Sequence, residues 1–229
     1  MTPIILLTSG IAFLIFHRKN HFFEERTEEL PEAHILRSEA LRESTDQGER
    51  MKQEVLSLRG TAYAAMFGAI TAVGAYIIIP FPLVPITMQT FFVSLAPALL
   101  GGALGALSQV IYILIGVIGF PVFAGGKAGF GVLMGPTGGY LVGFIVGAYI
   151  IGTLIEMKKK PSFIWMVSAM VIGHIALYTL GIAQLMFVTK LSLGKAFAVG
   201  VIPTLPGGIV KIVAAAFIAV KLKDKVRFP

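Results

Sequence analysis

The sequence contains no cysteine among its 229 residues, which excludes disulfides, thiolate metal sites, iron–sulfur clusters and cysteine nucleophiles. Charged residues make up only 14% of the chain, whereas a typical soluble domain has about 25%. Hydrophobic residues reach 56%, and the mean hydropathy is +0.84. This composition excludes an ordinary cytosolic enzyme and a disordered chain. Because helices satisfy their own backbone hydrogen bonds in lipid, it predicts an all-α polytopic membrane protein.

Motifs of the common enzyme classes are also missing from the sequence. It contains no HExxH, no GxSxG and no Walker A motif, which excludes zincin, α/β-hydrolase and P-loop chemistry. The run GGKAGFG at 125–131 is rich in glycine but lacks the spacing of a phosphate-binding loop. We therefore predict that the chain is not an enzyme, and that it carries no metal or cofactor. ATP hydrolysis, if transport is active, would come from another chain.

Acidic residues are scarce outside the first part of the chain. Residues 1–59 hold 8 Lys/Arg and 10 Asp/Glu, whereas residues 60–229 hold 11 Lys/Arg and 2 Asp/Glu. The cations of the second part lie between long apolar runs, so they indicate membrane topology rather than nucleic-acid binding.

The N-terminal part contains one short apolar run, residues 4–16, of 13 residues. A perpendicular span needs about 20 residues, so this run could be an interfacial anchor or a short, strained span. The sequence of 17–59 fits a solvated helix or a tail. Met51 opens a short polar leader into the first long apolar run and is an alternative start, in which case 1–50 would not be native. We expect an extension over 1–50 and a membrane domain over 51–229.

Apolar runs interrupted by Gly and Pro follow from Thr61 onward. They cover roughly 61–79, 87–100, 103–119, 138–156, 162–188 and 206–222. Proline cannot continue a helix, so the prolines after these runs are reasonable helix ends. The sequence therefore predicts a bundle of six transmembrane helices.

The distribution of cations predicts the orientation of this bundle. With the N-terminus inside, ten loop cations lie inside, namely Arg50, Lys52, Arg59, Lys158, Lys159, Lys160, Lys221, Lys223, Lys225 and Arg227. Three lie outside, namely Lys127, Lys190 and Lys195. This bias favours a topology with both termini inside.

The three outside segments, 80–90, 121–140 and 189–208, are rich in Gly and Pro. Irregular backbone at membrane depth persists only where protein or a water-filled cavity satisfies it. We therefore expect these segments to enclose a ligand cavity that opens to the outside.

Lys211 lies near the outer end of the sixth run, where an ionisable group costs several kcal/mol unless it is paired or hydrated. Beyond residue 59 the acids are Glu156 and Asp224, and this topology places both on the inner side. Lys211 could extend to the outer headgroups, or it could face the cavity and bind an anionic ligand. The second alternative predicts a small carboxylate-bearing ligand.

Few polar side chains are available to support Lys211. Thr87, Gln89 and Tyr140 lie near the outer ends of the runs and could hydrogen-bond a ligand, while Phe123 and Phe130 could form an apolar wall. Gln109, Tyr112 and His174 lie within runs, and we expect them to be structural.

Small residues recur every four positions in the first run. Ala64, Gly68 and Ala72 form one row, and Ala65 and Ala69 form the next. Such rows allow helices to approach closely in lipid, either within this bundle or against another membrane subunit.

Four segments resemble the BioY family, the biotin-binding S components of energy-coupling factor (ECF) transporters. They are VPITMQT, LLGGALGALSQVIYILIGVIGFPVFAGG, GVLMGPTGGYLVGF and LPGGIVK, and the resemblance covers roughly 58–225. It implies a six-helix subunit in a prokaryotic plasma membrane that captures biotin from outside. It also implies a transmembrane coupling subunit and two ATP-binding-cassette ATPases as partners, with Ala65 and Ala69 matching the docking row. Gly126 and Lys127 join the candidate site in this comparison.

The sixth run departs from the family pattern at one position. The family commonly has Pro-Gly-Asp-x-x-Lys, and this chain has PGGIVK at 206–211, so Gly208 stands where an aspartate is expected. Losing that acceptor costs on the order of 1 kcal/mol. Alternatives to biotin capture are an S component for another small anionic vitamin, a biotin carrier without ATPases, and a scaffold without a ligand. A homo-oligomer is left open.

Overall fold

The structure is a computed structural model that describes residues 36, 39, 41–47, 58–223 and 225. The chain forms two compact units, 1–53 and 54–229. In the first unit the described residues are helical and exposed. The apolar run 4–16 and the alternative start at Met51 lie outside the described residues.

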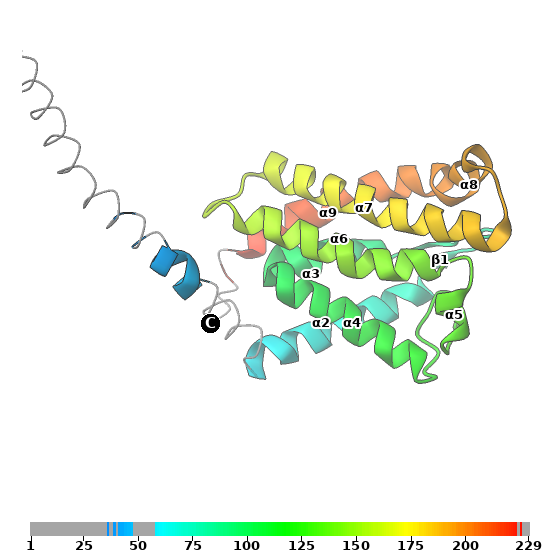
Figure 1. The fold of residues 1–229 in the computed structure, drawn as a ribbon, viewed down its shortest axis with the longest axis horizontal. Coiled ribbons are helices and arrows are strands. Elements are labelled where there is room, and N and C mark those ends of the chain that lie inside the picture. The colour runs from blue at the N-terminus through cyan, green and yellow to red at the C-terminus, as the bar shows by residue number, and fades with distance from the viewer. Residues whose placement is uncertain (1–35, 37–38, 40, 48–57, 224, 226–229) are drawn as a thin grey trace, which may run out of the picture. The chain divides into compact units, whose positions relative to one another are not determined.

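The second unit is mostly helical (Figure 1). Its long helices are α2 (Leu58–Tyr76), α3 (Gln89–Leu100), α4 (Gly102–Val117), α6 (Gly138–Glu156), α7 (Phe163–Thr189) and α9 (Leu205–Lys223). Shorter elements are the paired strands β1 (Ile78–Ile79) and β2 (Ile86–Thr87), the helices α5 (Gly131–Met134) and α8 (Leu193–Gly200), and the 3₁₀ turn η1 (Ile202–Thr204).

Three stretches of the described chain are long and apolar enough to cross a membrane. They are Gly138–Glu156, Phe163–Thr189 and the stretch Leu193–Lys223, which combines α8, η1 and α9. Helices α3 and α4 are apolar but shorter. The fold is therefore that of a helical membrane protein with several spans, as the composition predicts.

Packing in this unit places α3 at its centre, because α3 contacts α2, α4, α6 and α9. Helix α6 packs against α4 on one side and α7 on the other. One end of the bundle carries β1, α5 and α8, and we call it the pocket end (Figure 1). The turn at 157–162 lies at the opposite end.

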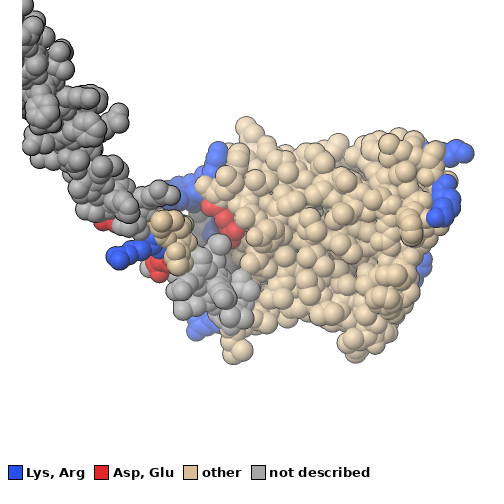
Figure 2. Space-filling model, in the orientation of Figure 1, with Lys and Arg blue, Asp and Glu red and all other residues tan. Residues whose placement is uncertain are grey.

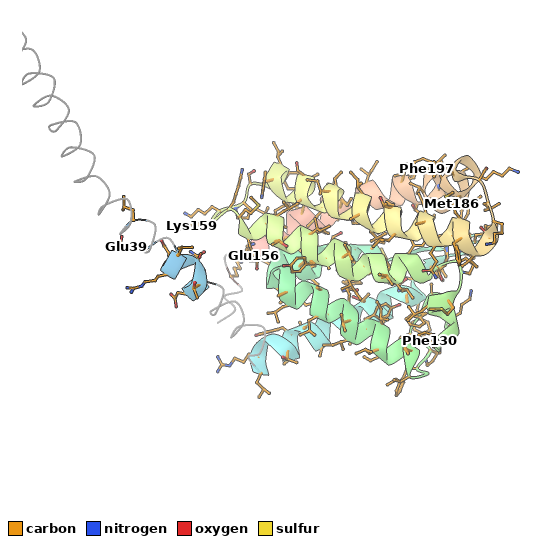
Figure 3. All side chains as sticks on the ribbon, viewed as in Figure 1. Glu39, Phe130, Glu156, Lys159, Met186 and Phe197 are labelled. Carbon is orange, nitrogen blue, oxygen red and sulfur yellow. The ribbon has the colours of Figure 1, made fainter. Side chains whose placement is uncertain are left out.

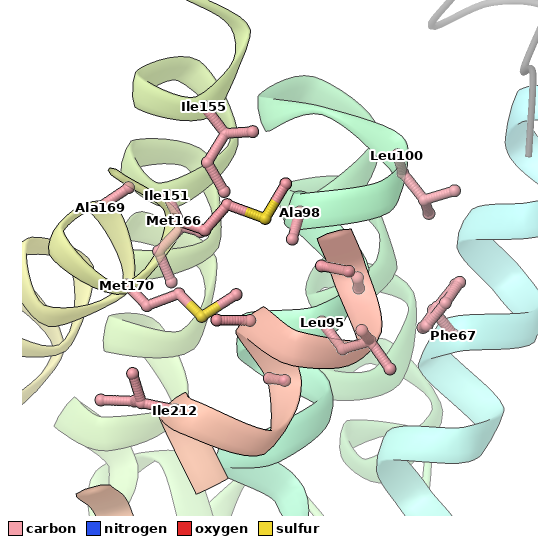
Figure 4. Close-up of a cluster of buried hydrophobic side chains, with 14 of the residues drawn as sticks. Phe67, Leu95, Ala98, Leu100, Ile151, Ile155, Met166, Ala169, Met170 and Ile212 are labelled. Carbon is pink, nitrogen blue, oxygen red and sulfur yellow. The ribbon is translucent and has the colours of Figure 1, made fainter. Parts of the chain in front are cut away.

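Two separate apolar clusters fill the bundle. The cluster of the opposite end joins α2, α3, α4, α6, α7 and α9, and includes Leu95, Met166, Met170 and Ile212 (Figure 4). The cluster of the pocket end includes Tyr112, Phe123, Tyr140 and Leu177. The first is a packed core, and the second surrounds the pocket described below.

Charges of the second unit gather at its two ends. On the face shown in Figure 2, Lys and Arg lie at both ends and the surface between them is free of charge. Glu156 and Lys159 lie at the opposite end, whereas Met186 and Phe197 lie at the pocket end (Figure 3). An uncharged band between charged ends is what a bilayer requires.

The helix boundaries differ from the sequence expectations in two places. The run 61–79 ends as a helix at Tyr76, and Ile78 then pairs with Thr87 in a short antiparallel ladder. The outside segments, expected to be irregular, contain short helices: α5 lies in 121–140, and α8 and η1 lie in 189–208. Ile and Thr favour strands, and the ladder pairs backbone groups next to the prolines of 80–85.

Candidate functional site

A pocket with a cavity volume of about 80 Å³ opens between the helices at the pocket end. Its walls come from the β1–β2 loop and β2, from α3, from the 121–131 loop, and from α5, α6, α7, η1 and α9. The lining residues are Val84, Pro85, Ile86, Thr87, Gln89, Thr90, Phe123, Ala124, Lys127, Val132, Thr137, Tyr140, Leu141, Phe144, Leu177, Tyr178, Thr204 and Lys211. Small-molecule sites have this mixture of apolar walls with few polar groups.

Lys211 projects from the second turn of α9 into this pocket, and only 9% of it is exposed. Its Nζ donates to the Thr87 carbonyl at 2.8 Å and to Thr90 Oγ1 at 2.7 Å. The side chain therefore does not extend to the surface, which was the first alternative for this residue. An ammonium carries three N–H donors, so one donor is left over from these two contacts. Both partners are neutral oxygen atoms, an arrangement that suits an incoming anion.

Thr87 and Gln89 form a buried polar chain with a residue of α4. Thr87 Oγ1 donates to Gln89 Oε1 at 2.7 Å, and Gln89 Nε2 donates to the Tyr112 hydroxyl. The Tyr112 hydroxyl donates in turn to the Val122 carbonyl at 3.1 Å. Tyr112 thus packs between helices as expected. It also connects Gln89, which lines the pocket, to Val122 of the 121–131 loop.

The 121–131 loop is held by Phe123, whose side chain is 1% exposed. Its ring lies against Gly116 of α4, where a Cβ would overlap the ring, and meets the Tyr112 ring edge-to-face at 5.7 Å. Phe123 N also donates to the Lys127 carbonyl at 3.0 Å. These contacts present Phe123 and Lys127 together to the pocket.

Tyr140, Tyr178 and Thr204 line the side of the pocket formed by α6, α7 and η1. The Tyr140 hydroxyl donates to the Gly200 carbonyl at 3.1 Å, and the Tyr178 hydroxyl lies 2.9 Å from Thr204 Oγ1. The two tyrosine rings meet edge-to-face at 6.4 Å. This wall therefore presents phenolic oxygen atoms.

Gly208 lies next to this wall without lining it. A Cβ at this position would lie 3.7 Å from the Tyr178 hydroxyl oxygen and would meet no closer atom. A side chain at residue 208 would therefore point toward Tyr178, and its absence leaves that hydroxyl uncovered.

Two candidates from the sequence lie away from the lining. Phe130, offered as an apolar wall, is 59% exposed and lies at the outside of the bundle (Figure 3). Gly126 is absent from the lining, and its φ of 72° forms the tight turn that returns the chain from Phe123 to Lys127. Loop spacing does not show which side of a loop faces the cavity.

The remaining polar candidates are buried in the bundle outside the lining. Gln109 Nε2 donates to Ser108 Oγ at 2.9 Å, and Gln109 is fully buried. His174 Nδ1 bonds to the Met170 carbonyl at 2.9 Å. Gln109 Oε1 and His174 Nε2 find no partner among the described residues.

Sequence reasoning missed Tyr178 and Thr204. Tyr178 stands in the middle of the longest helix, and Thr204 stands between a short helix and the start of α9. Each had one available signal, a polar group in an apolar context, but only the folded arrangement brings the two hydroxyls together.

The two small-residue rows of α2 have different surroundings. Ala64 and Gly68 are buried, and a Cβ on Gly68 would come within 2.9 Å of the Ser108 carbonyl of α4. Ala69 is exposed and Ala65 is partly exposed. The first row therefore packs inside this bundle, and the second remains available on its surface.

Comparison with known proteins gives consistent relationships. Residues 49–228 match the model of the BioY family. The chain is 45% identical over 166 residues to a biotin transporter BioY of Thermotoga maritima, covering 72% of this chain and 96% of the relative. It is 40% identical over 177 residues to a probable biotin transporter BioY of Lysinibacillus sphaericus, covering 75% and 88%.

A solved structure shares the fold. The S-component for biotin from an ECF-type ABC transporter superposes with a TM-score of 0.69 at 24% identity, over 75% of this chain and 94% of that one. The match of the family model over most of the chain, together with these relatives, places the sequence in one group of membrane proteins. The chain belongs to the BioY family.

Proposed function

We propose that this chain captures biotin from outside the cell and delivers it as the substrate-binding subunit of an ECF-type importer. It does no chemistry on its ligand, and ATP hydrolysis takes place on partner subunits. Its relatives carry the name biotin transporter. The chain itself is a membrane protein of a family of transporters.

The observation that carries this proposal is the buried ammonium of Lys211 in a largely apolar pocket. Biotin has a carboxylate, an aliphatic chain and a compact ring system, so it needs one cation, apolar walls and a few hydrogen-bonding groups. In this assignment Lys211 faces the carboxylate. Phe123 forms an apolar wall, and Thr87, Gln89 and Tyr140 contact the polar atoms of the rings. Lys127 stands beside Phe123 in the loop that covers the site.

The topology that fits this role has six spans with both termini inside. The helices α2, α3, α4, α6, α7 and α9 would be the spans, and the pocket end would face outward in a prokaryotic plasma membrane. The membrane domain would be 51–229, with 1–50 as a dispensable extension. The exposed row of Ala65 and Ala69 would dock a transmembrane coupling subunit, which itself carries two ABC-type ATPases.

The direct test is calorimetry on the full chain in detergent. Biotin is titrated beside dethiobiotin, biotin amide and thiamine. Tight binding of biotin, weakened for the amide and absent for thiamine, would support the proposal. A folded sample that binds thiamine or another vitamin in place of biotin would assign the chain to a different ligand. Copurification with ATPase subunits then distinguishes an ECF subunit from a carrier that works alone.

A further inference from the structure

The pocket contains a pair of hydroxyl groups whose hydrogen atoms can be assigned. Thr204 Oγ1 donates to the Val201 carbonyl at 2.7 Å. A threonine hydroxyl has a single hydrogen, so Thr204 has none left for Tyr178. The 2.9 Å contact between the two side chains is therefore donated by Tyr178.

This assignment fixes the role of the Tyr178 oxygen. Because its hydrogen is held by Thr204, only its lone pairs are available, and the residue lines the pocket. Gly208 leaves the oxygen uncovered, since even a Cβ at that position would lie 3.7 Å away. Thr204 is 8% exposed, so water competes little with its hydrogen bonds to Tyr178 and to the Val201 carbonyl. The Tyr178 oxygen is an acceptor that awaits a donor.

Lys211 and Thr90 have the complementary character. Lys211 has a remaining N–H, and Thr90 accepts from Lys211 so that its own hydroxyl hydrogen is available. Donors thus come from α3 and α9, whereas the acceptor comes from α7. A pocket of this kind selects a ligand that carries both an N–H donor and acceptor atoms.

From these contacts we infer that Tyr178 is a specificity-determining residue, whose hydroxyl oxygen accepts a hydrogen bond from a ureido N–H of the ligand. Thr204 is the positioning residue that holds the Tyr178 hydroxyl in its acceptor orientation. This inference rests on the proposed function, because it takes the ligand to be biotin, which has two ureido N–H groups. It also supplies an acceptor in a chain that has glycine at residue 208.

The test compares biotin with biotin methylated at both ureido nitrogens, by calorimetry on the full chain. We expect Tyr178→Phe to weaken biotin about five- to tenfold, the usual effect of one buried hydrogen bond. The ratio of affinities for biotin and the methylated analogue should shrink by the same factor. The ratio of biotin to biotin amide should not change, because that ratio reports on the carboxylate.

Variants of Thr204 separate positioning from packing. Thr204→Val keeps the shape and removes the hydroxyl, so the Tyr178 hydrogen is no longer held and the ratio should also shrink. Thr204→Ser keeps the hydroxyl, so the ratio of affinities for biotin and the methylated analogue should equal that of the unaltered chain. Tyr149→Phe alters a tyrosine that is 53% exposed and should leave every affinity unchanged.

An unchanged ratio between biotin and its methylated analogue in a folded Tyr178→Phe protein would overturn the inference while leaving biotin capture intact. A smaller ratio for biotin over biotin amide in the same variant would also overturn it, because Tyr178 would then act on the carboxylate. Failure of the unaltered chain to bind biotin would instead refute the proposed function, and the inference with it.

Discussion

Lys211 is the cation that we propose for the ligand's carboxylate. It is buried, it keeps two hydrogen bonds to neutral oxygen atoms, and its position next to Thr87 and Thr90 connects α9 to the start of α3. Removing it therefore has two effects, since the ligand loses its cation and the two helices lose a connection.

We expect Lys211→Ala to weaken biotin binding by at least about tenfold, because a hydrogen bond to a charged group contributes more than a neutral one. Calorimetry measures the change. Lys195→Ala serves as the control, since Lys195 is exposed in α8 and outside the pocket. Unchanged binding in Lys211→Ala would remove Lys211 from the site.

Gly116 determines where Phe123 lies. The Phe123 ring occupies the place where a side chain on residue 116 would start, so any larger residue displaces the ring. We expect Gly116→Val to lower biotin affinity by about tenfold or more, by moving the loop that carries Phe123 and Lys127.

Gly131→Ala is the matched control for this change, because a Cβ at residue 131 meets no atom within 4 Å. Both variants are compared by calorimetry after their melting temperatures in detergent have been measured. Equal affinities in the two variants would show that the Phe123 position does not matter for the ligand.

At the scale of single helices, α2 has two faces with different surroundings. The Ala64 and Gly68 face packs against α4, and the Ala69 face is open. A substitution on one face should therefore affect stability, and one on the other should affect assembly.

We expect Ala65→Leu or Ala69→Leu to leave biotin binding intact and to abolish uptake, because a bulky residue prevents close approach of a partner helix. The readouts are calorimetry on the isolated chain and biotin uptake by cells that make the whole transporter. Loss of binding in the isolated chain would make this row structural.

Gly68→Leu is the contrasting variant, since its side chain would meet the α4 backbone. It should lower the melting temperature of the isolated chain, and Ala69→Leu should not.

Helix α6 and helix α7 show how much of the fold follows from local sequence. Their predicted ranges, 138–156 and 162–188, agree with the observed ones within a residue, because Pro136 and Pro161 interrupt the apolar runs. The β1–β2 pair and α8 were missed, since their hydrogen bonds and burial depend on neighbours far along the chain. Thr87, Gln89 and Tyr140 were predicted from their positions near helix ends, Phe123 from its outside segment, and Lys211 as a cation without an acidic partner; all five line the pocket.

Tyr178, in contrast, carries only a weak local signal. It is one of several polar side chains in a 27-residue apolar helix, and helical periodicity does not say which of the helix faces meets η1. Its acceptor role appears only when the Thr204 hydroxyl and the Val201 carbonyl are both known. The residue proposed to distinguish ligands is therefore less visible in the sequence than the residue proposed to pair with the carboxylate.

The whole molecule separates into a membrane unit and an N-terminal unit. The boundary between the units falls at residues 53 and 54, and the family match begins at residue 49. The residues that line the pocket all belong to the membrane unit.

We therefore expect a chain of residues 51–229 to bind biotin with the affinity of the full chain, within about a factor of two to three. Calorimetry on the two proteins in the same detergent checks this. A folded truncated chain that binds much more weakly would show that residues 1–50 contribute to the site.

The packed cluster of Leu95, Met166, Met170 and Ile212 has a consequence for how the molecule handles its cargo (Figure 4). None of its side chains lines the pocket, and close-packed side chains leave no space for a ligand between them. We therefore expect a bound ligand to enter and leave this unit at the pocket end.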